Sequence, residues 1–295
     1  MHKSIQIISG IHRSGTTFLG KLININNDFS SIHEPLNNDV GVKNNDFWYP
    51  YYSIKNKHCS SEKALMNIYN ENLEFKNTNK GKFDFSRKLL KSRGNIQFIT
   101  HKLFNPNKNI VYKDPFMSLC GHYFLERNPK SKMVFLIRHP KSFYKSNLKM
   151  NWDFDFNLFP LEQILIDYPV LKCNIHIGTY EERLYTLYNI IYFNILEIIK
   201  KFPYQTMFIR HEDFCINPEV ETKKICNFFN IDYSLNHQKF IDANMKNVSS
   251  KIKSGKQFNF KRNSKLPAVD RLNKGVSDLV DFEHIINEAV LDIYR

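Results

Sequence analysis

The residues best suited to chemistry lie near the amino terminus, in the run GIHRSGTT from Gly10 to Thr17. Its two glycines have the spacing of the phosphate-binding loop G-x-x-x-x-G-K-[ST], and the run lies between a predicted strand and a predicted helix. Glycines let backbone N–H groups curl around an oxyanion, and a helix N-terminus adds partial positive charge. The run therefore predicts a site for a phosphate or sulfate group.

One position departs from that loop, because Thr16 stands where the lysine of a P-loop kinase would be. A nucleoside triphosphatase would lose its contact to the β- and γ-phosphates there, whereas Arg13 supplies a positive charge three residues earlier. The sequence also has no clear magnesium-binding aspartate at the end of an apolar strand. Both features count against a P-loop kinase or nucleotide hydrolase, which remains the alternative enzyme.

The segment Arg-Ser-Gly-Thr-Thr after a strand resembles the 5′-phosphosulfate loop of sulfotransferases that use 3′-phosphoadenosine-5′-phosphosulfate (PAPS). The resemblance implies that Arg13, Ser14, Gly15, Thr16 and Thr17 bind the 5′-phosphate and the sulfuryl group. It also implies PAPS as co-substrate, adenosine 3′,5′-bisphosphate as product, and no required metal.

A second motif of the same family is a strand that ends in arginine, with a serine eight residues later. The chain has FLIRHP at 135–140, where the apolar run ends at Arg138, and Ser146 follows eight residues after that arginine. By resemblance both bind the 3′-phosphate. Arg138 would leave the carboxyl edge of a strand, which is where α/β sheets bind ligands, and Ser146 would lie about two turns into the next helix.

A general base is needed to deprotonate an acceptor hydroxyl, and Glu34 in SIHEP is the predicted one. It follows a short β-like run, 29–32, and tyrosylprotein and several carbohydrate sulfotransferases have a glutamate at a similar interval. His33 is the rival base, because a histidine has a pKa near neutrality. On an alternating strand it would point away from Glu34.

The segment VYKDPF around Lys113 is similar to the NKDPF segment of tyrosylprotein sulfotransferases. The resemblance implies that Lys113 stabilises the leaving phosphate and that Asp114 holds the loop or the lysine. A further match, IRHEDF at 209–214, is similar to the family's RYEDL junction, where Glu212 and Asp213 are expected to be architectural.

The elements that position these residues alternate between short apolar runs and amphipathic stretches. Strands are expected at 5–9, 110–112, 133–137 and 206–209, and helices near 14–25, 61–73, 116–127, 140–149, 180–201 and 218–229. This alternation predicts an α/β fold with a central parallel sheet flanked by helices. With no repeat or clear linker, residues 1–295 are expected to form a single sulfotransferase domain.

Three segments fall outside this pattern. Residues 36–105 are rich in Asn and Lys, and residues 151–178 are irregular, so both are expected to be insertions on the acceptor side. The basic segment 246–275 is either a mobile tail or a loop that covers the nucleotide.

The net charge of the chain indicates which class of partner it could bind. Lys and Arg exceed Asp and Glu by 42 − 29 = +13, which suits an anionic partner or a solvated basic surface. A nucleic-acid-binding protein is the alternative from another class, but no reader motif or stacking signature supports it. The expected partner is a hydroxyl-bearing acceptor: a glycan slightly favoured, then peptide tyrosine, or a small molecule. The oligomeric state is left open.

Five scattered cysteines without a C-x-x-C pair argue against a disulfide framework or a zinc site. No apolar run approaches the ~20 residues of a membrane span, and the first strand begins too early to leave room for a signal peptide. The sequence thus predicts a cytoplasmic protein.

Overall fold

The protein is described by a computed structural model over residues 4–76, 92–150, 152–246 and 284–294. The described residues form one five-stranded parallel sheet of β1 (Ile5–Ser9), β2 (Ser30–His33), β3 (Ile110–Lys113), β4 (Lys132–Ile137) and β5 (Thr206–Arg210). The strand order is β2-β3-β1-β4-β5, so β1 is central and its neighbours are β3 and β4. The predicted fold class is confirmed.

Each inner strand is mostly apolar and almost entirely buried, as expected of a strand covered on both faces. All of β1 is buried, and Ile7 pairs with Tyr112 of β3 and with Met133 of β4. Since all strands are parallel, their carboxyl ends meet at one edge of the sheet. The order of the strands reverses at β1, and such a switch point is where α/β sheets bind ligands.

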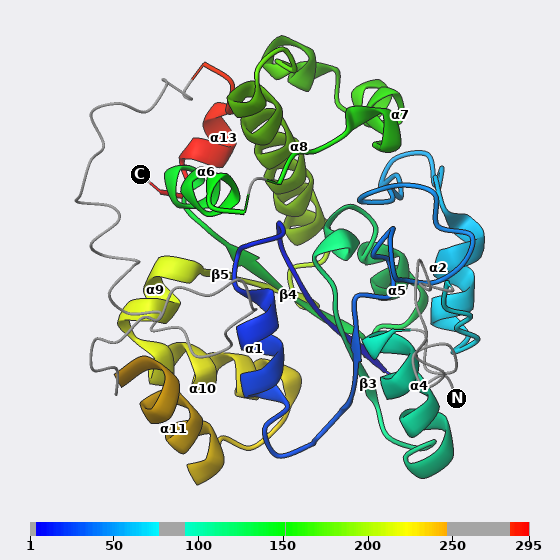
Figure 1. Ribbon diagram of the computed structural model, residues 1–295, viewed down its shortest axis with the longest axis vertical. Helices are drawn as coiled ribbons and strands as arrows, with labels where there is room; N and C mark the ends of the chain where they lie inside the picture. Colours follow the sequence, from blue (N-terminus) through cyan, green and yellow to red (C-terminus); the bar gives the residue numbers. More distant parts are fainter. Residues whose placement is uncertain (1–3, 77–91, 151, 247–283, 295) are drawn as a thin grey trace, which may run out of the picture.

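Helices cover both faces of the sheet. One face packs against α1 (Thr16–Ile23), α9 (His211–Ile216), α10 (Pro218–Phe229) and α11 (Leu235–Ile241). The other face packs against α2 (Glu62–Tyr69), α5 (His122–Arg127), α6 (Pro140–Leu148), α8 (Tyr180–Lys201) and α13 (Glu288–Leu291). Figure 1 shows α9, α10 and α11 grouped beside α1, with α8 on the opposite side of the strands.

The longest helix, α8, begins with a capping box in which Thr179 and Glu182 satisfy each other's backbone N–H groups. It is buried along most of its length. Tyrosines on this helix hold the end of β4.

Several boundaries differ from the sequence-based expectations. The helix expected at 116–127 is a 3₁₀ turn, Pro115–Leu119, followed by α5, because Asp114 caps the turn and the chain leaves helical geometry at Cys120. The stretch 151–178 contains α7 (Leu161–Asp167) and the 3₁₀ turns Phe156–Leu158 and Pro169–Asn174.

Helix α4 (Arg93–Phe104) lies inside the segment 36–105, where only the helix near 61–73 was expected. Helix α4 lacks the usual spacing of apolar residues, because its buried side consists of Gly94, Asn95 and His101, whereas Leu103 and Phe104 are exposed. Gly94 allows the close approach of this helix to β2, since a Cβ there would lie 2.6 Å from the His33 carbonyl oxygen.

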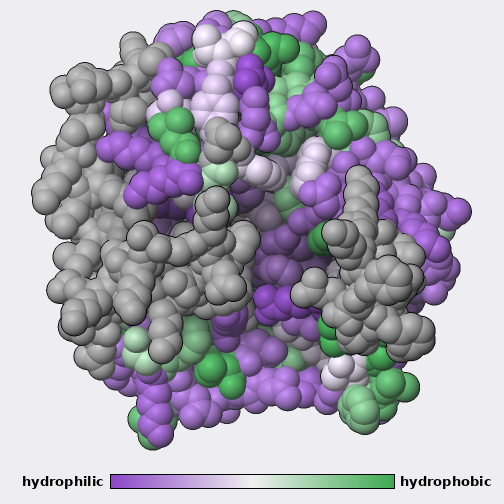
Figure 2. Space-filling model, in the orientation of Figure 1, coloured by the Kyte–Doolittle hydropathy of each residue, from purple (hydrophilic) through white to green (hydrophobic). Residues whose placement is uncertain are grey.

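Figure 2 shows that hydrophilic residues line the recessed centre of the face seen in Figure 1. Among the described residues, no helix is long and apolar enough to cross a membrane. The basic segment 246–275 lies outside the described residues beyond Lys246.

Candidate active site

The loop from Gly10 to Thr17 joins β1 to α1 and depends on left-handed backbone geometry. Gly10 has φ +139° and Gly15 has φ +105°, values that favour glycine. A Cβ on Gly10 would lie 2.2 Å from the Leu136 carbonyl oxygen, so no larger residue fits between the loop and β4. Arg13 also has a positive φ, +68°. The loop therefore turns tightly at the carboxyl end of the central strand, as predicted.

The donors of this loop are available to a ligand. Helix α1 begins at Thr16, and within the described chain no acceptor is found for the backbone N–H groups of Thr16 and Thr17. The Ser14 hydroxyl is buried and has no hydrogen-bond partner in the same part of the chain. Buried polar atoms are normally paired, so an anion that enters the loop would satisfy donors that the protein leaves open.

Arg138 leaves the end of β4 and reaches the phosphate loop. Its Nη1 donates to the Arg13 carbonyl oxygen at 2.6 Å. Two tyrosines of α8 fix its backbone, since Arg138 N–H donates to Tyr192 Oη at 3.2 Å and Tyr188 Oη donates to the Arg138 carbonyl at 2.7 Å. The backbone of Arg138 is thus fixed by helix α8 as well as by the strand.

Ser146 lies on α6 and also meets the loop. Arg13 Nε donates to Ser146 Oγ at 3.2 Å. The structure therefore brings together Arg13, Arg138 and Ser146, which are separated by more than 120 residues of sequence at the widest. Two guanidinium groups and a hydroxyl at one place form a cation-rich site that suits a phosphate group.

A buried hydrogen-bond network that no sequence motif indicates adjoins the loop at His12. His12 Nδ1 contacts Tyr49 Oη at 2.7 Å, and His12 Nε2 contacts Asn147 Oδ1 at 2.9 Å. The Asn147 amide nitrogen donates to the Phe143 carbonyl, so its oxygen accepts from His12 Nε2–H. Burial lowers the pKa of His12 to about 3, which keeps the imidazole neutral. No motif marks these residues; only the tertiary fold joins them.

Glu34 and Lys113 form an ion pair at the ends of neighbouring strands β2 and β3. Lys113 Nζ contacts Glu34 Oε1, the Glu34 N–H donates to the Lys113 carbonyl at 2.9 Å, and Asn37 Nδ2 donates to Glu34 Oε2 at 2.9 Å. Burial alone would raise the pKa of Glu34, but the Lys113 ammonium and the other donors outweigh it. The pKa of Glu34 is therefore below its ordinary value, and the carboxylate is ionised at neutral pH.

The expectation that His33 points away from Glu34 is wrong. His33 Nε2 lies 3.7 Å from Glu34 Oε1. The strand ends at His33, and Glu34 has φ +48°, so the side-chain alternation of a strand no longer applies at this step. Burial, and next the charge of Lys113, lowers the pKa of His33 to about 4.

Asp114 holds the loop after β3. Its Oδ2 accepts from Leu36 N–H at 2.7 Å and its Oδ1 accepts from Phe116 N–H at 2.9 Å. Burial and then the Glu34 carboxylate raise the pKa of Asp114 to about 7. Of the two roles expected for Asp114, these bonds show loop support, which fixes the backbone on both sides of the Glu34–Lys113 pair.

At the end of β5, Glu212 Oε1 accepts from His139 N–H at 3.1 Å, and Asp213 pairs with Arg210 at 2.7 Å. Glu212 therefore links the start of α9 to the residue after Arg138, whereas the Asp213 pair is local and exposed, and neither carboxylate caps α9 through its side chain. No group of three or more His, Cys, Asp or Glu residues in the described ranges has an arrangement that could hold a metal ion.

Comparison with known proteins places this geometry in a family. A model of the sulfotransferase family matches residues 7–234, which include the phosphate loop, Glu34, Lys113, Arg138 and Ser146. No curated protein matches the chain.

Solved structures similar to this chain include three sulfotransferases of low identity. The sulfotransferase domain from the curacin biosynthetic pathway is 17% identical, with 81% of this chain and 78% of that chain covered and a TM-score of 0.45. The sulfotransferase domain of the Synechococcus olefin synthase is 12% identical, with 98% and 92% covered and a TM-score of 0.45. A sulfotransferase from Mycobacterium tuberculosis is 13% identical, with 82% and 71% covered and a TM-score of 0.45.

Proposed function

Because the chain belongs to the sulfotransferase family, we propose that it transfers a sulfuryl group from PAPS to the hydroxyl of an acceptor. The observation that carries the proposal is the meeting of two sets of residues at one edge of the sheet. Arg13, Arg138 and Ser146 form the cation-rich site, and the Glu34–Lys113 pair stands at the adjacent strand ends.

Each part of the donor has a matching group in this arrangement. The open N–H groups of Thr16 and Thr17 and the Ser14 hydroxyl suit the 5′-phosphosulfate. Arg138 and Ser146 suit the 3′-phosphate, which ATP and AMP lack. The site therefore distinguishes the donor by a phosphate that ordinary nucleotides do not carry.

In the proposed reaction, Glu34 accepts the proton of the acceptor hydroxyl as its oxygen forms a bond to sulfur. The bond between sulfur and the bridging oxygen of the 5′-phosphate breaks, and Lys113 neutralises the charge that grows on that oxygen. The products are the sulfate ester and adenosine 3′,5′-bisphosphate. Positioning in line, rather than covalent chemistry by the protein, supplies most of the rate.

In this reaction the Lys113 ammonium interacts in turn with the Glu34 carboxylate and with the leaving phosphate. Lys113 contacts Glu34 in the structure, and it would turn toward the leaving phosphate when the donor is bound. That shift removes the charge that depresses the pKa of Glu34, so the carboxylate becomes a stronger base when the donor is present.

The acceptor is a hydroxyl-bearing molecule, with glycan, peptide tyrosine and small molecule as the candidate classes. The test is incubation with sulfur-labelled PAPS and a panel of glycans, tyrosine peptides and phenols. The proposal expects labelled product with at least one class, together with equimolar adenosine 3′,5′-bisphosphate. Label that stays on PAPS with every class would argue against it.

A further inference from the structure

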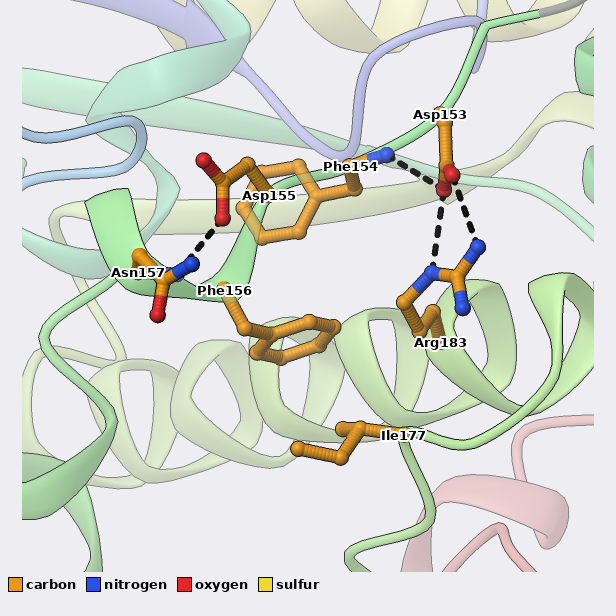
Figure 3. Close-up of a pocket in the computed structure, with 7 residues that line it drawn as sticks. All are labelled: Asp153, Phe154, Asp155, Phe156, Asn157, Ile177 and Arg183. Atoms are coloured by element: carbon orange, nitrogen blue, oxygen red, sulfur yellow. Dashed lines mark hydrogen bonds and ion pairs between the residues drawn. The ribbon is translucent and has the colours of Figure 1, made fainter.

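A pocket of about 450 Å³ lies within the segment 151–178 and the start of α8. It is lined by seven residues: Asp153, Phe154, Asp155, Phe156, Asn157, Ile177 and Arg183. Its volume is within the range of small-molecule sites. Figure 3 shows an apolar strip of Phe154, Phe156 and Ile177, with Asp155 and Asn157 on one side and Asp153 and Arg183 on the other.

The two walls of the pocket are held in place by α8. Arg183 binds Asp153 in a bidentate pair, with Nη2–Oδ2 2.7 Å and Nε–Oδ1 3.1 Å, and its Nη1 donates to the Gly178 carbonyl at 3.0 Å. Thr186 adds a second attachment, since its Oγ1 donates to the His176 carbonyl at 2.7 Å. One helix therefore fixes both the wall that carries Phe154 and Phe156 and the wall that carries Ile177.

The apolar strip is open to a ligand at one end and continuous with the core at the other. Ile177 is 46% exposed, whereas Phe154 is buried and its ring centroid lies 5.1 Å from that of Phe156. An exposed isoleucine beside an aromatic ring offers a surface that an apolar group of a ligand would cover.

Aromatic rings connect this pocket to the phosphate loop. Phe154 packs on Tyr49, with centroids 6.1 Å apart, and Tyr49 Oη accepts from the His12 backbone N–H at 2.9 Å. Trp152, the residue before the pocket wall, lies with its ring 4.2 Å from that of His12. The pocket is thus separated from the loop by about one layer of packed rings, those of Trp152, Phe154 and Tyr49.

The charge of the pocket contrasts with that of the chain. Arg183 neutralises Asp153, and within the described residues Asp155 makes no ion pair, its Oδ1 accepting from Asn157 N–H at 2.9 Å. A single negative charge therefore remains in a protein of net charge +13. This charge disfavours carboxylated, phosphorylated or sulfated acceptors.

We propose that this pocket binds the part of the acceptor remote from its hydroxyl. The acceptor is then an alcohol or phenol with an extended apolar substituent that is uncharged or ends in a cationic group. The inference rests on the proposed sulfuryl transfer and narrows its acceptor. The pocket favours an apolar acceptor over the glycan that was expected from the sequence, and over an acidic tyrosine peptide.

The test compares 4-methylphenol with 4-octylphenol as acceptors in wild type, Phe156→Ala and Ile177→Ala. Both variants should raise KM for 4-octylphenol roughly tenfold, as expected for one lost apolar contact, and leave KM for 4-methylphenol unchanged. Ile216→Ala is the matched control, because Ile216 is 51% exposed and lies on α9, across the sheet. Unchanged KM values for both phenols in both pocket variants would overturn the inference while leaving sulfuryl transfer intact.

A second readout does not need catalysis. The only two tryptophans of the chain, Trp48 and Trp152, pack together near the pocket with centroids 6.0 Å apart. Titration of 4-octylphenol should change tryptophan fluorescence saturably in wild type, and Phe156→Ala should weaken that binding roughly tenfold. A fluorescence titration that Phe156→Ala leaves unaltered would also contradict the pocket, whether or not the protein proves to be a sulfotransferase.

The charge preference has its own comparison. Phenols with a long chain ending in an amine or in a carboxylate should differ in KM, and Asp155→Asn should reduce that ratio roughly two- to fivefold at low salt. An unchanged KM ratio would show that the Asp155 carboxylate does not determine which charged phenol is preferred.

Discussion

Glu34 shows how burial and charge act in opposite directions on one carboxylate. Burial disfavours its ionised form, while Lys113 beside it favours that form, and the net effect is a pKa below the ordinary value. His33 lies beside Glu34, with its Nε2 3.7 Å from Glu34 Oε1, but burial and Lys113 lower its pKa to about 4. Both groups are deprotonated at neutral pH, so protonation state alone does not select the base.

Substitution separates the two candidates. Glu34→Gln keeps the shape of the side chain and removes its basicity, so turnover should fall by about 10²- to 10⁴-fold, the usual contribution of a positioned base. The affinity for adenosine 3′,5′-bisphosphate should change little. His33→Gln is the matched control and should retain near-normal turnover, because in the proposal the histidine only neighbours the base.

Steady-state rates with saturating PAPS measure this difference. A slow His33→Gln with a normal Glu34→Gln would make histidine the base. Two active variants would place the base elsewhere.

Asp114 provides a test through stability instead of rate. Its pKa is raised from 3.8 to about 7 by burial and the nearby Glu34, so the folded protein binds this proton more tightly than the unfolded chain. The contribution is full below pH 3.8 and is lost as pH rises through 7. The free energy of unfolding should therefore fall over this range in wild type, and Asp114→Asn should remove that part of the fall.

Urea unfolding at a series of pH values measures the difference between the two proteins. Asp153→Asn is a control of opposite sign, because the Arg183 hydrogen bonds lower the pKa of Asp153, and this exposed pair contributes stability only above that pKa. Parallel wild-type and Asp114→Asn curves would show that the Asp114 carboxyl titrates as in the unfolded chain.

Helix α8 holds the backbone of Arg138, the residue proposed to bind the 3′-phosphate, through two tyrosine hydroxyls. Tyr188 donates to the Arg138 carbonyl at 2.7 Å, so Tyr188→Phe removes one anchor of the β4 end. The binding of adenosine 3′,5′-bisphosphate should weaken by about 1 kcal/mol, the usual net value of such a hydrogen bond, while AMP binding should change less. Tyr204→Phe on the exposed surface is the control.

Calorimetric titration of both nucleotides distinguishes positioning from general damage. A loss confined to the 3′-phosphate nucleotide supports positioning by Tyr188. An equal loss for AMP would indicate a structural defect of the whole site.

The strands β1, β3, β4 and β5 could be predicted because each contains a short apolar run, and α1, α2, α6, α8 and α10 could be predicted as well. No helix was expected at the positions of α7, α9, α11 and α13. Helix α4 could not be predicted, because it buries glycine and asparagine and exposes its large apolar residues. The convergence of His33 and Glu34 depends on a single positive φ, which no local pattern in SIHEP indicates. The His12–Tyr49–Asn147 network joins three separate segments, so only the fold could reveal it.

At the scale of the whole molecule, the net charge of +13 and the local charges serve different purposes. Arg13, Arg138 and Lys113 lie at neighbouring strand ends, where their fields add at one point. The rest of the charge is compatible with a solvated basic surface. If it served nucleic acid instead, RNA would bind more tightly than adenosine 3′,5′-bisphosphate at moderate salt.

We propose that this edge of the sheet binds a nucleotide with phosphates on both the 3′ and 5′ positions. Binding tests it without knowledge of the acceptor. Calorimetry in magnesium-free buffer should show adenosine 3′,5′-bisphosphate binding far more tightly than ATP or AMP. Arg138→Ala should weaken that binding by about 1.5–3 kcal/mol, the range for a hydrogen bond to a charged group. Lys223→Ala on α10, which loses the same charge, should not. Tighter binding of ATP with magnesium, or equal affinity of wild type and Arg138→Ala for the bisphosphate, would contradict the account.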